Sequence, residues 1–111
     1  MDISYNLRYQ KQNFANRVII DKEGEIIIYG KGFRLKGKGA TDKGELINFS
    51  EIKEFYYRND KIFFITFNKE KYTLSDAGTQ FGQLIVDIYK ARNEFLMDAL
   101  FMKGGKLKAE F

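Results

Sequence analysis

The chain has 111 residues, a net charge of +4 and 16% aromatic residues, with neither cysteine nor histidine. This length is enough for one domain with its own hydrophobic core. The lack of cysteine excludes disulfides and thiolate metal sites, and the lack of histidine removes the commonest general base and metal ligand. We therefore expect no cofactor, no metal site and no enzymatic activity. A polar start at Met1 and the lack of an apolar run of about 20 residues favour a cytoplasmic protein without a transmembrane segment.

The first half of the chain shows the alternating apolar pattern of β-strands. β-branched runs at 18–20 and 26–29 flank the polar segment 21–25, which contains Gly24, and this arrangement predicts a hairpin turn there. Further strands are predicted at 3–9, 32–36 and 46–49. The first half is thus predicted to be all-β.

The second half begins with more strands and then changes period. Residues 55–58 and 61–67 are predicted to pair across Asn59-Asp60, a dipeptide that suits a tight turn, and 71–75 forms the next strand. The prediction for the whole chain is about seven antiparallel strands joined by short connections.

A long helix is predicted at 79–103, where apolar residues recur at spacings of three and four. Thr79 suits the N-cap, and Lys103 followed by Gly104-Gly105 is a helix stop signal. We therefore expect one domain at 1–103 and a C-terminal tail, or the start of a linker, at 104–111.

This order of elements resembles the pleckstrin-homology superfold. The pattern of apolar residues over 46–57, 61–67 and 72–75 is similar to that of bacterial PH-like and GRAM-type domains. The resemblance implies a bent, partly open antiparallel barrel capped by the helix. Eukaryotic members often hold phosphoinositide headgroups with basic residues on the loop between the first two strands, where this chain offers only Lys11 and Arg17.

From these patterns we predict the core of the domain. Its members are apolar residues on the inward faces of the strands and of the helix: Ile19, Ile27, Phe49, Ile62, Phe64, Leu74, Leu84, Ile85, Ile88 and Phe95.

The positive charge is concentrated between residues 31 and 43. Five cations lie there against the single acid Asp42: Lys31, Arg34, Lys36, Lys38 and Lys43. Such a segment attracts anions, which makes an anion-binding or phospholipid-headgroup-binding module one functional hypothesis. The other interpretation is a solvated loop whose lysines protect a sheet edge from pairing with other chains.

Two motifs suggest chemistry only superficially. Residues 32–39 nearly match a phosphate-binding P-loop, but Gly39 stands where the Mg²⁺-binding hydroxyl belongs, and no helical pattern follows. The acidic residues Asp21, Glu23 and Glu25 are too closely spaced for an EF-hand, and we expect them to be salt-bridged or solvated. The serines have no histidine partner, so no catalytic residue is assigned.

The far end of the helix is the preferred functional surface. Apolar residues occur on nearly all sides of the helix at this end. The expected interaction residues are Phe95, Met97, Phe101 and Met102. The alternative is that the N-terminal segment covers this end through Tyr5 and Tyr9. The predicted function is a non-catalytic binding module that contacts a protein or a neighbouring domain, or a second copy of the chain, through the helix and strand edges. Anionic lipid is the alternative partner, and nucleic acid is not expected.

Overall fold

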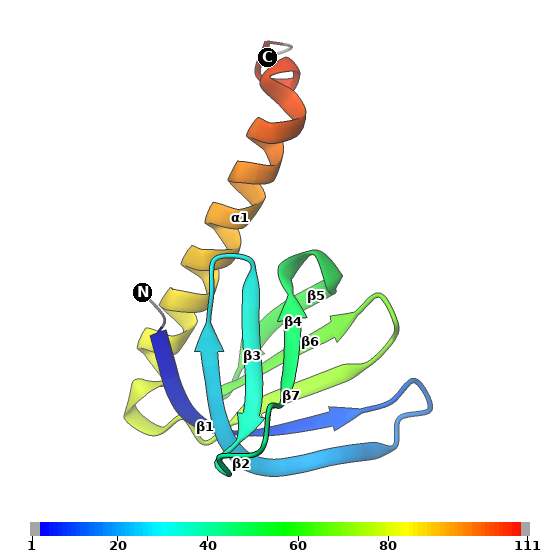
Figure 1. The fold of residues 1–111 in the computed structure, drawn as a ribbon, viewed down its shortest axis with the longest axis vertical. Coiled ribbons are helices and arrows are strands. Elements are labelled where there is room, and N and C mark those ends of the chain that lie inside the picture. The colour runs from blue at the N-terminus through cyan, green and yellow to red at the C-terminus, as the bar shows by residue number, and fades with distance from the viewer. Residues whose placement is uncertain (1–2, 110–111) are drawn as a thin grey trace.

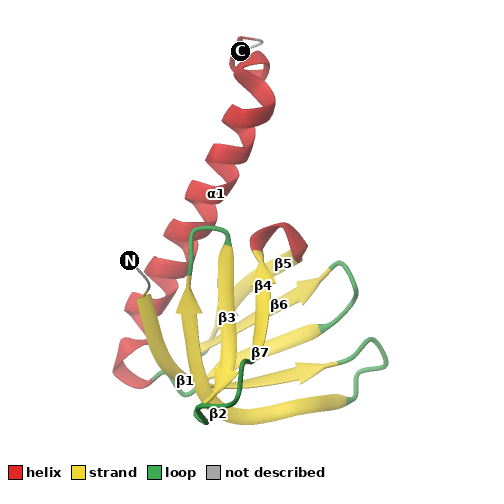
Figure 2. Cartoon of the chain, viewed as in Figure 1, coloured by secondary structure: helices red, strands yellow, loops and turns green. Residues whose placement is uncertain are grey.

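The computed structural model describes the backbone of residues 3–109 and the side chains of residues 3–101. Seven strands precede one long helix (Figures 1 and 2). The strands are β1 (Ile3–Gln12), β2 (Val18–Ile28), β3 (Gly32–Gly37), β4 (Glu45–Asn48), β5 (Ile52–Arg58), β6 (Lys61–Thr66) and β7 (Lys71–Ser75). The helix is α1 (Phe81–Ala109), and short 3₁₀ turns lie at η1 (Phe49–Glu51) and η2 (Gly78–Gln80).

The strands form one antiparallel sheet in the order β4-β3-β2-β1-β7-β6-β5. Strand β1 joins the two halves, because its whole length pairs with β2 and its second half, from Arg8 to Gln12, also pairs with β7. The sheet curls on itself, and the first part of α1 lies against it (Figure 1). The predicted architecture of about seven antiparallel strands and one C-terminal helix is confirmed.

The hairpin predicted at 21–25 is wrong, because β2 runs through this segment as a single strand. Gly24 pairs with Leu7 on one side and with Gly37 on the other. A Cβ atom at Gly24 would lie only 1.9 Å from the Lys36 carbonyl oxygen. The glycine therefore serves the close approach of two strands and not a chain reversal, and sequence alone does not separate these two uses.

Two predicted core residues of β2 are also misplaced. The β1–β2 register passes from Lys11↔Ile20 to Gln12↔Val18, so Ile19 is the extra residue of a β-bulge, and its side chain is 52% exposed. Ile27 lies on the outer face of the strand, because its neighbours Ile26 and Ile28 are the buried ones. Both errors come from side-chain alternation, in which a shift of one residue exchanges the two faces.

The other predicted core residues lie in or against the core. Six are buried: Phe49, Ile62, Phe64, Leu74, Leu84 and Ile88. Ile85 and Phe95 are partly buried and pack against that cluster. Alternate residues of β1 complete it, namely Tyr5, Leu7 and Tyr9.

The turn at Asn59-Asp60 is confirmed. Strands β5 and β6 pair up to Arg58↔Lys61, which leaves a two-residue loop. Both loop residues have left-handed backbone angles, with φ of 52° at Asn59 and 61° at Asp60. This is the conformation of the type I′ hairpin turn, which Asn and Asp tolerate well.

The bounds of the helix differ from the prediction of 79–103. Thr79 lies inside η2 and is not an N-cap, since α1 begins at Phe81. The helix also continues through Gly104 and Gly105 to Ala109. Each glycine costs a helix only about 1 kcal/mol relative to alanine, so the pair is a weak stop signal. The division into a domain at 1–103 and a tail or linker at 104–111 stays a prediction.

Helix α1 has 29 residues and is therefore about 43 Å long. Its first turns cover the sheet, and its C-terminal part extends past the ends of the strands (Figure 1). Within the described residues, no helix combines the length and the hydropathy that a membrane span requires.

Candidate functional site

The first part of α1 is fixed to the sheet by aromatic contacts. Tyr89 packs edge-on against Phe55 of β5, with ring centroids 5.2 Å apart. One and a half turns later, Phe95 contacts Phe49 at 5.8 Å. Leu84 and Ile88 are buried on the same face of the helix. Phe95, an expected interaction residue, therefore also holds the helix against the core.

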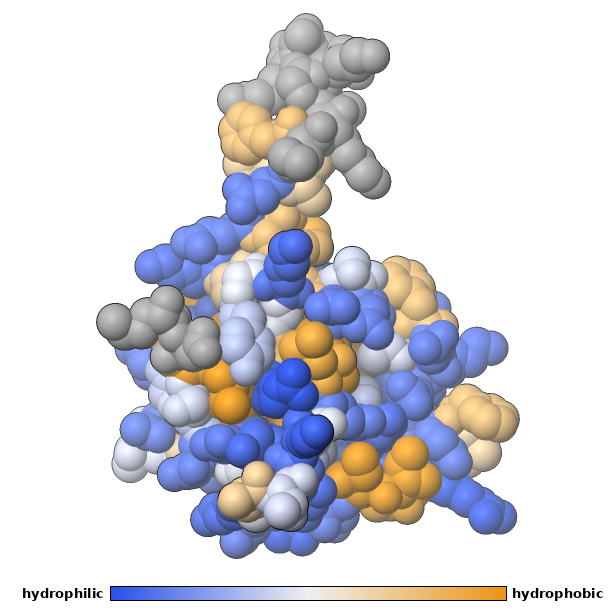
Figure 3. Space-filling model, viewed as in Figure 1, coloured by the Kyte–Doolittle hydropathy of each residue, from blue (hydrophilic) through white to orange (hydrophobic). Residues whose placement is uncertain are grey.

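The helix exposes apolar side chains directly after Phe95. The exposed fractions are 41% for Leu96, 52% for Met97, 50% for Leu100 and 50% for Phe101. Figure 3 shows apolar atoms on this part of the molecule, above the body of the sheet. Of the expected interaction residues, Met97 and Phe101 lie four residues apart on this part of the helix and are exposed, whereas the side chain of Met102 lies outside the described residues.

The N-terminal strand contacts the base of α1. The Tyr5 hydroxyl donates a hydrogen bond to the Asp87 carboxylate, and Tyr9 is buried inside the sheet. Burial and the hydrogen bond to Asp87 raise the pKa of Tyr5 to about 12. Asp87 precedes Leu96 by about two and a half turns. The two tyrosines, which the alternative interpretation placed over the far end of the helix, therefore pack elsewhere.

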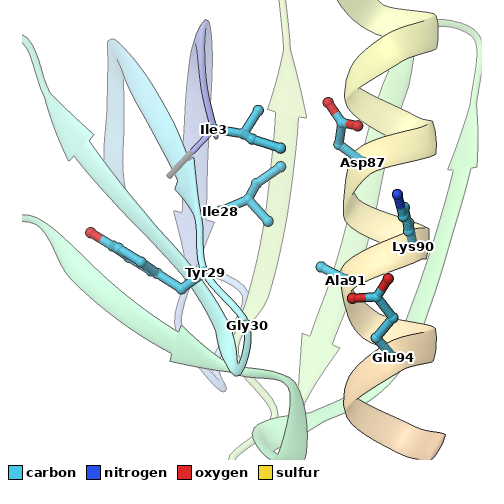
Figure 4. A pocket seen from close by; sticks show the side chains of 8 residues that line it. All are labelled: Ile3, Ile28, Tyr29, Gly30, Asp87, Lys90, Ala91 and Glu94. Carbon is cyan, nitrogen blue, oxygen red and sulfur yellow. The ribbon is translucent and has the colours of Figure 1, made fainter. Parts of the chain in front are cut away.

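A groove of about 410 Å³ lies between the sheet and this part of α1 (Figure 4). Ile3 and Ile28 form its apolar wall on the sheet, and Asp87, Lys90 and Glu94 come from the helix. Asp87 already accepts hydrogen bonds from Tyr5 and from Gln83. Lys90 and Glu94 are therefore the charged groups available to a ligand. The sequence did not reveal this groove, because β1 and α1 are far apart in the chain.

Lys11, which the resemblance places near a headgroup site, is neutralised by acidic residues of the protein itself. Lys11 is 9% exposed, and its Nζ lies 2.5 Å from Glu45 and 3.3 Å from Glu70. Burial is the largest single influence and lowers the pKa of Lys11, but the hydrogen bonds and charges of Glu45 and Tyr72 together outweigh it and keep the pKa above its usual value. Tyr72 also donates to Glu45, at 3.1 Å. Of the two cations expected on that loop, only Arg17 is exposed.

The structure brings most of the basic segment to the outer face of the sheet. Arg34 and Lys36 point outward from β3, Lys31 lies in the turn before it, and Lys38 and Lys43 lie in the loop after it. Two of these cations interact with other groups of the protein: Arg34 donates to the Lys43 carbonyl at 2.8 Å, and Lys36 lies 3.8 Å from Glu25.

The acidic residues of β2 are accounted for by ordinary surface interactions. Asp21 accepts from Arg8 at 2.8 Å, Glu25 faces Lys36, and Glu23 is exposed. Among the described residues there is no cluster of three or more carboxylates suited to a metal ion.

Two exposed phenylalanines were missed by the sequence analysis. Phe14 is 76% exposed in the β1–β2 loop, and Phe67 is 64% exposed in the β6–β7 loop. Phe67 directly follows β6, and Phe14 lies two residues after the end of β1. The alternating pattern ends at these positions and gives no indication of burial. The bulge places Ile19 close to the first of these loops.

Comparison with known proteins identifies the fold. No protein-family model matches the sequence, and no curated protein matches it. The chain is similar in structure to the C-terminal domain of an unknown protein from Leishmania infantum, with a TM-score of 0.63 and 15% identity, covering 81% of each chain. It is also similar to the pleckstrin homology domain of ArhGAP27, with a TM-score of 0.59 and 7% identity, covering 83% of this chain and 99% of that one. The fold is therefore PH-like, a curled antiparallel sheet with one C-terminal helix.

Proposed function

We propose that this protein is a non-catalytic binding module that contacts another protein chain through the projecting end of α1. The observation that carries the proposal is the exposure of Leu96, Met97 and Leu100 on consecutive turns, directly after Phe95, which packs against Phe49. Exposed apolar patches of this kind mark interaction sites, and methionine adapts to varied partner surfaces. The PH-like fold, which commonly serves as a binding scaffold, supports the same proposal.

The surface is a convex helical ridge. A ridge of this shape fits an apolar groove or another helix, with side chains at i and i+4 as anchors. The occupant that we assign is the same surface on a second copy of the chain, since an apolar ridge is complementary to itself. The exposed residues from Leu96 to Phe101 span less than two helical turns and bury less surface than a standard interface, so we expect a weak, concentration-dependent dimer. The edge strands β4 and β5 are additional contact surfaces in this proposal.

Sedimentation velocity over a wide range of protein concentration tests this function. We expect the average mass to rise with concentration and the rise to persist in about 0.5 M salt, because screening weakens charge pairs and not apolar contacts. Met97→Glu should abolish association. The matched control is Val86→Glu, on the same helix and 55% exposed but beside the sheet, which should leave association unchanged. A strict monomer at all concentrations would refute the assignment of a second copy.

A further inference from the structure

The outer face of the first half of the sheet carries two grooves that share one wall. One groove, of about 500 Å³, is lined by residues that include Tyr29, Lys31, Arg34 and Leu46. The other, of about 320 Å³, is lined by residues that include Ile27, Arg34, Lys36 and Lys43. Because Arg34 belongs to both, the two grooves lie next to each other on the surface that faces away from α1.

Strand register explains how this face is built. Arg34 on β3 lies opposite Ile27 on β2 and Leu46 on β4, so the three side chains share the outer face. Tyr29 lies two residues after Ile27, and Figure 4 shows its ring pointing away from α1. The result is a partly buried arginine side chain that lies between apolar side chains. In Figure 3, polar side chains surround an apolar patch on the face formed by β2, β3 and β4.

Lys36 on this face is paired with Glu25, but the charge of the other cations is not cancelled by the acids near them. Arg34 donates to the carbonyl oxygen of Lys43, which is a neutral acceptor, so its position is held while its charge remains. Asp42 is occupied: its carboxylate accepts from the backbone of Gly37 and Gly44 and pairs with Lys22. Among the described residues, no carboxylate forms an ion pair with Arg34, Lys31 or Lys43.

We propose that this face binds an extended acidic segment of a partner protein. A side-chain carboxylate of the segment would accept from the remaining N–H groups of Arg34, whose planar fork suits bidentate pairing. An apolar side chain beside it would lie on Ile27 or Leu46, and Lys31 and Lys43 would attract further acids. A peptide fits better than a bilayer, because Arg34 lines two adjacent grooves that an extended segment can follow and that a flat membrane surface does not enter.

This site is independent of the surface proposed on α1, and its test is separate. A fluorescein-labelled peptide of alternating Glu and Ser with one central Leu is titrated with the full chain at low salt, and anisotropy is measured. The matched peptide carries Gln in place of every Glu. We expect saturable binding of the acidic peptide alone, weakening as salt rises. Arg34→Gln should weaken binding about tenfold, and Arg34→Lys should restore part of the loss.

Two further variants keep the result interpretable. Lys43→Gln changes an exposed side chain, so the fold is retained, and binding should weaken about threefold. Lys61→Gln removes an equally exposed cation from the other half of the sheet and should change nothing. The proposal is overturned if the acidic peptide does not bind, if the Gln peptide binds equally, or if Lys61→Gln matches Arg34→Gln. It is equally overturned if inorganic phosphate or phosphatidylserine vesicles, and not the peptide, show the binding that depends on Arg34.

Discussion

Replacing Lys11 by methionine tests whether the ion pairs of Lys11 with Glu45 and Glu70 stabilise the fold. Its Nζ lies 2.5 Å from Glu45 and 3.3 Å from Glu70, and only 11% of its side chain is exposed. Methionine keeps the apolar stem but leaves two carboxylates without their counter-charge. Breaking a fully buried pair costs 3–5 kcal/mol. The carboxylates are 28% and 31% exposed, so solvent screening reduces the expected loss to about 2 kcal/mol.

The assay is urea unfolding at neutral pH, followed by circular dichroism. A loss of about 2 kcal/mol also lowers the melting temperature by about 8 °C in a domain of this size. Adding Glu45→Gln to Lys11→Met should recover part of the loss, because one uncompensated charge is then removed. The control is Lys71→Met on the neighbouring strand, which is exposed and should change stability by less than about 0.5 kcal/mol. If Lys11→Met were as stable as this control, the cluster would not be a structural element, and Lys11 would be available to ligands.

Three further results follow from contacts elsewhere in the molecule. Tyr5→Phe removes the hydrogen bond to Asp87 and should lower the free energy of unfolding by about 1 kcal/mol in urea titrations; unchanged stability would contradict that contact. Since the pKa of Tyr5 is about 12 in the folded protein and 10.0 ordinarily, its contribution is complete below pH 10 and disappears as pH rises from 10 to 12. Tyr5→Phe should therefore flatten the alkaline loss of stability, and an identical pH profile would argue against the shift. Gly24→Ala should lower the free energy of unfolding by more than about 2 kcal/mol in urea titrations, because the new Cβ meets the Lys36 carbonyl. Gly30→Ala has open space around its new Cβ and should be nearly neutral in the same assay; equal stability of the two variants would contradict the close approach at Gly24.

Sequence patterns predicted the structure correctly where the conformation depends only on residues that are close together in the chain. Asn59 and Asp60 tolerate the left-handed backbone that a two-residue hairpin requires, so the turn was predictable from two residues. The periodicity around Leu84 and Ile88 likewise predicted the buried face of α1. The projection of Met97 followed from a helix that is apolar on all sides and a sheet too small to cover it.

Long-range contacts decided the rest. Gly24 is compatible with a turn or with a close strand crossing, and only the position of Lys36 on the neighbouring strand distinguishes them. Ile19 is exposed because a bulge against β1 changes the register, which no local pattern records. In the sequence, Lys11 is a cation that could bind an anionic ligand. In the structure it is neutralised by Glu45 and Glu70, which lie more than thirty residues away in the chain.

The sequence by itself therefore determined the order and type of most elements, with the hairpin at 21–25 as the exception, since these depend on side-chain period and on backbone preferences within a few residues. The tertiary structure decided which charges are available and which apolar groups are covered. Arg34 illustrates the difference: its charge was evident from the chain, but its place between two grooves and its neutral partner at Lys43 arise only when three strands pair side by side. Availability depends on what folding brings next to a side chain, and that information is distributed over the whole chain.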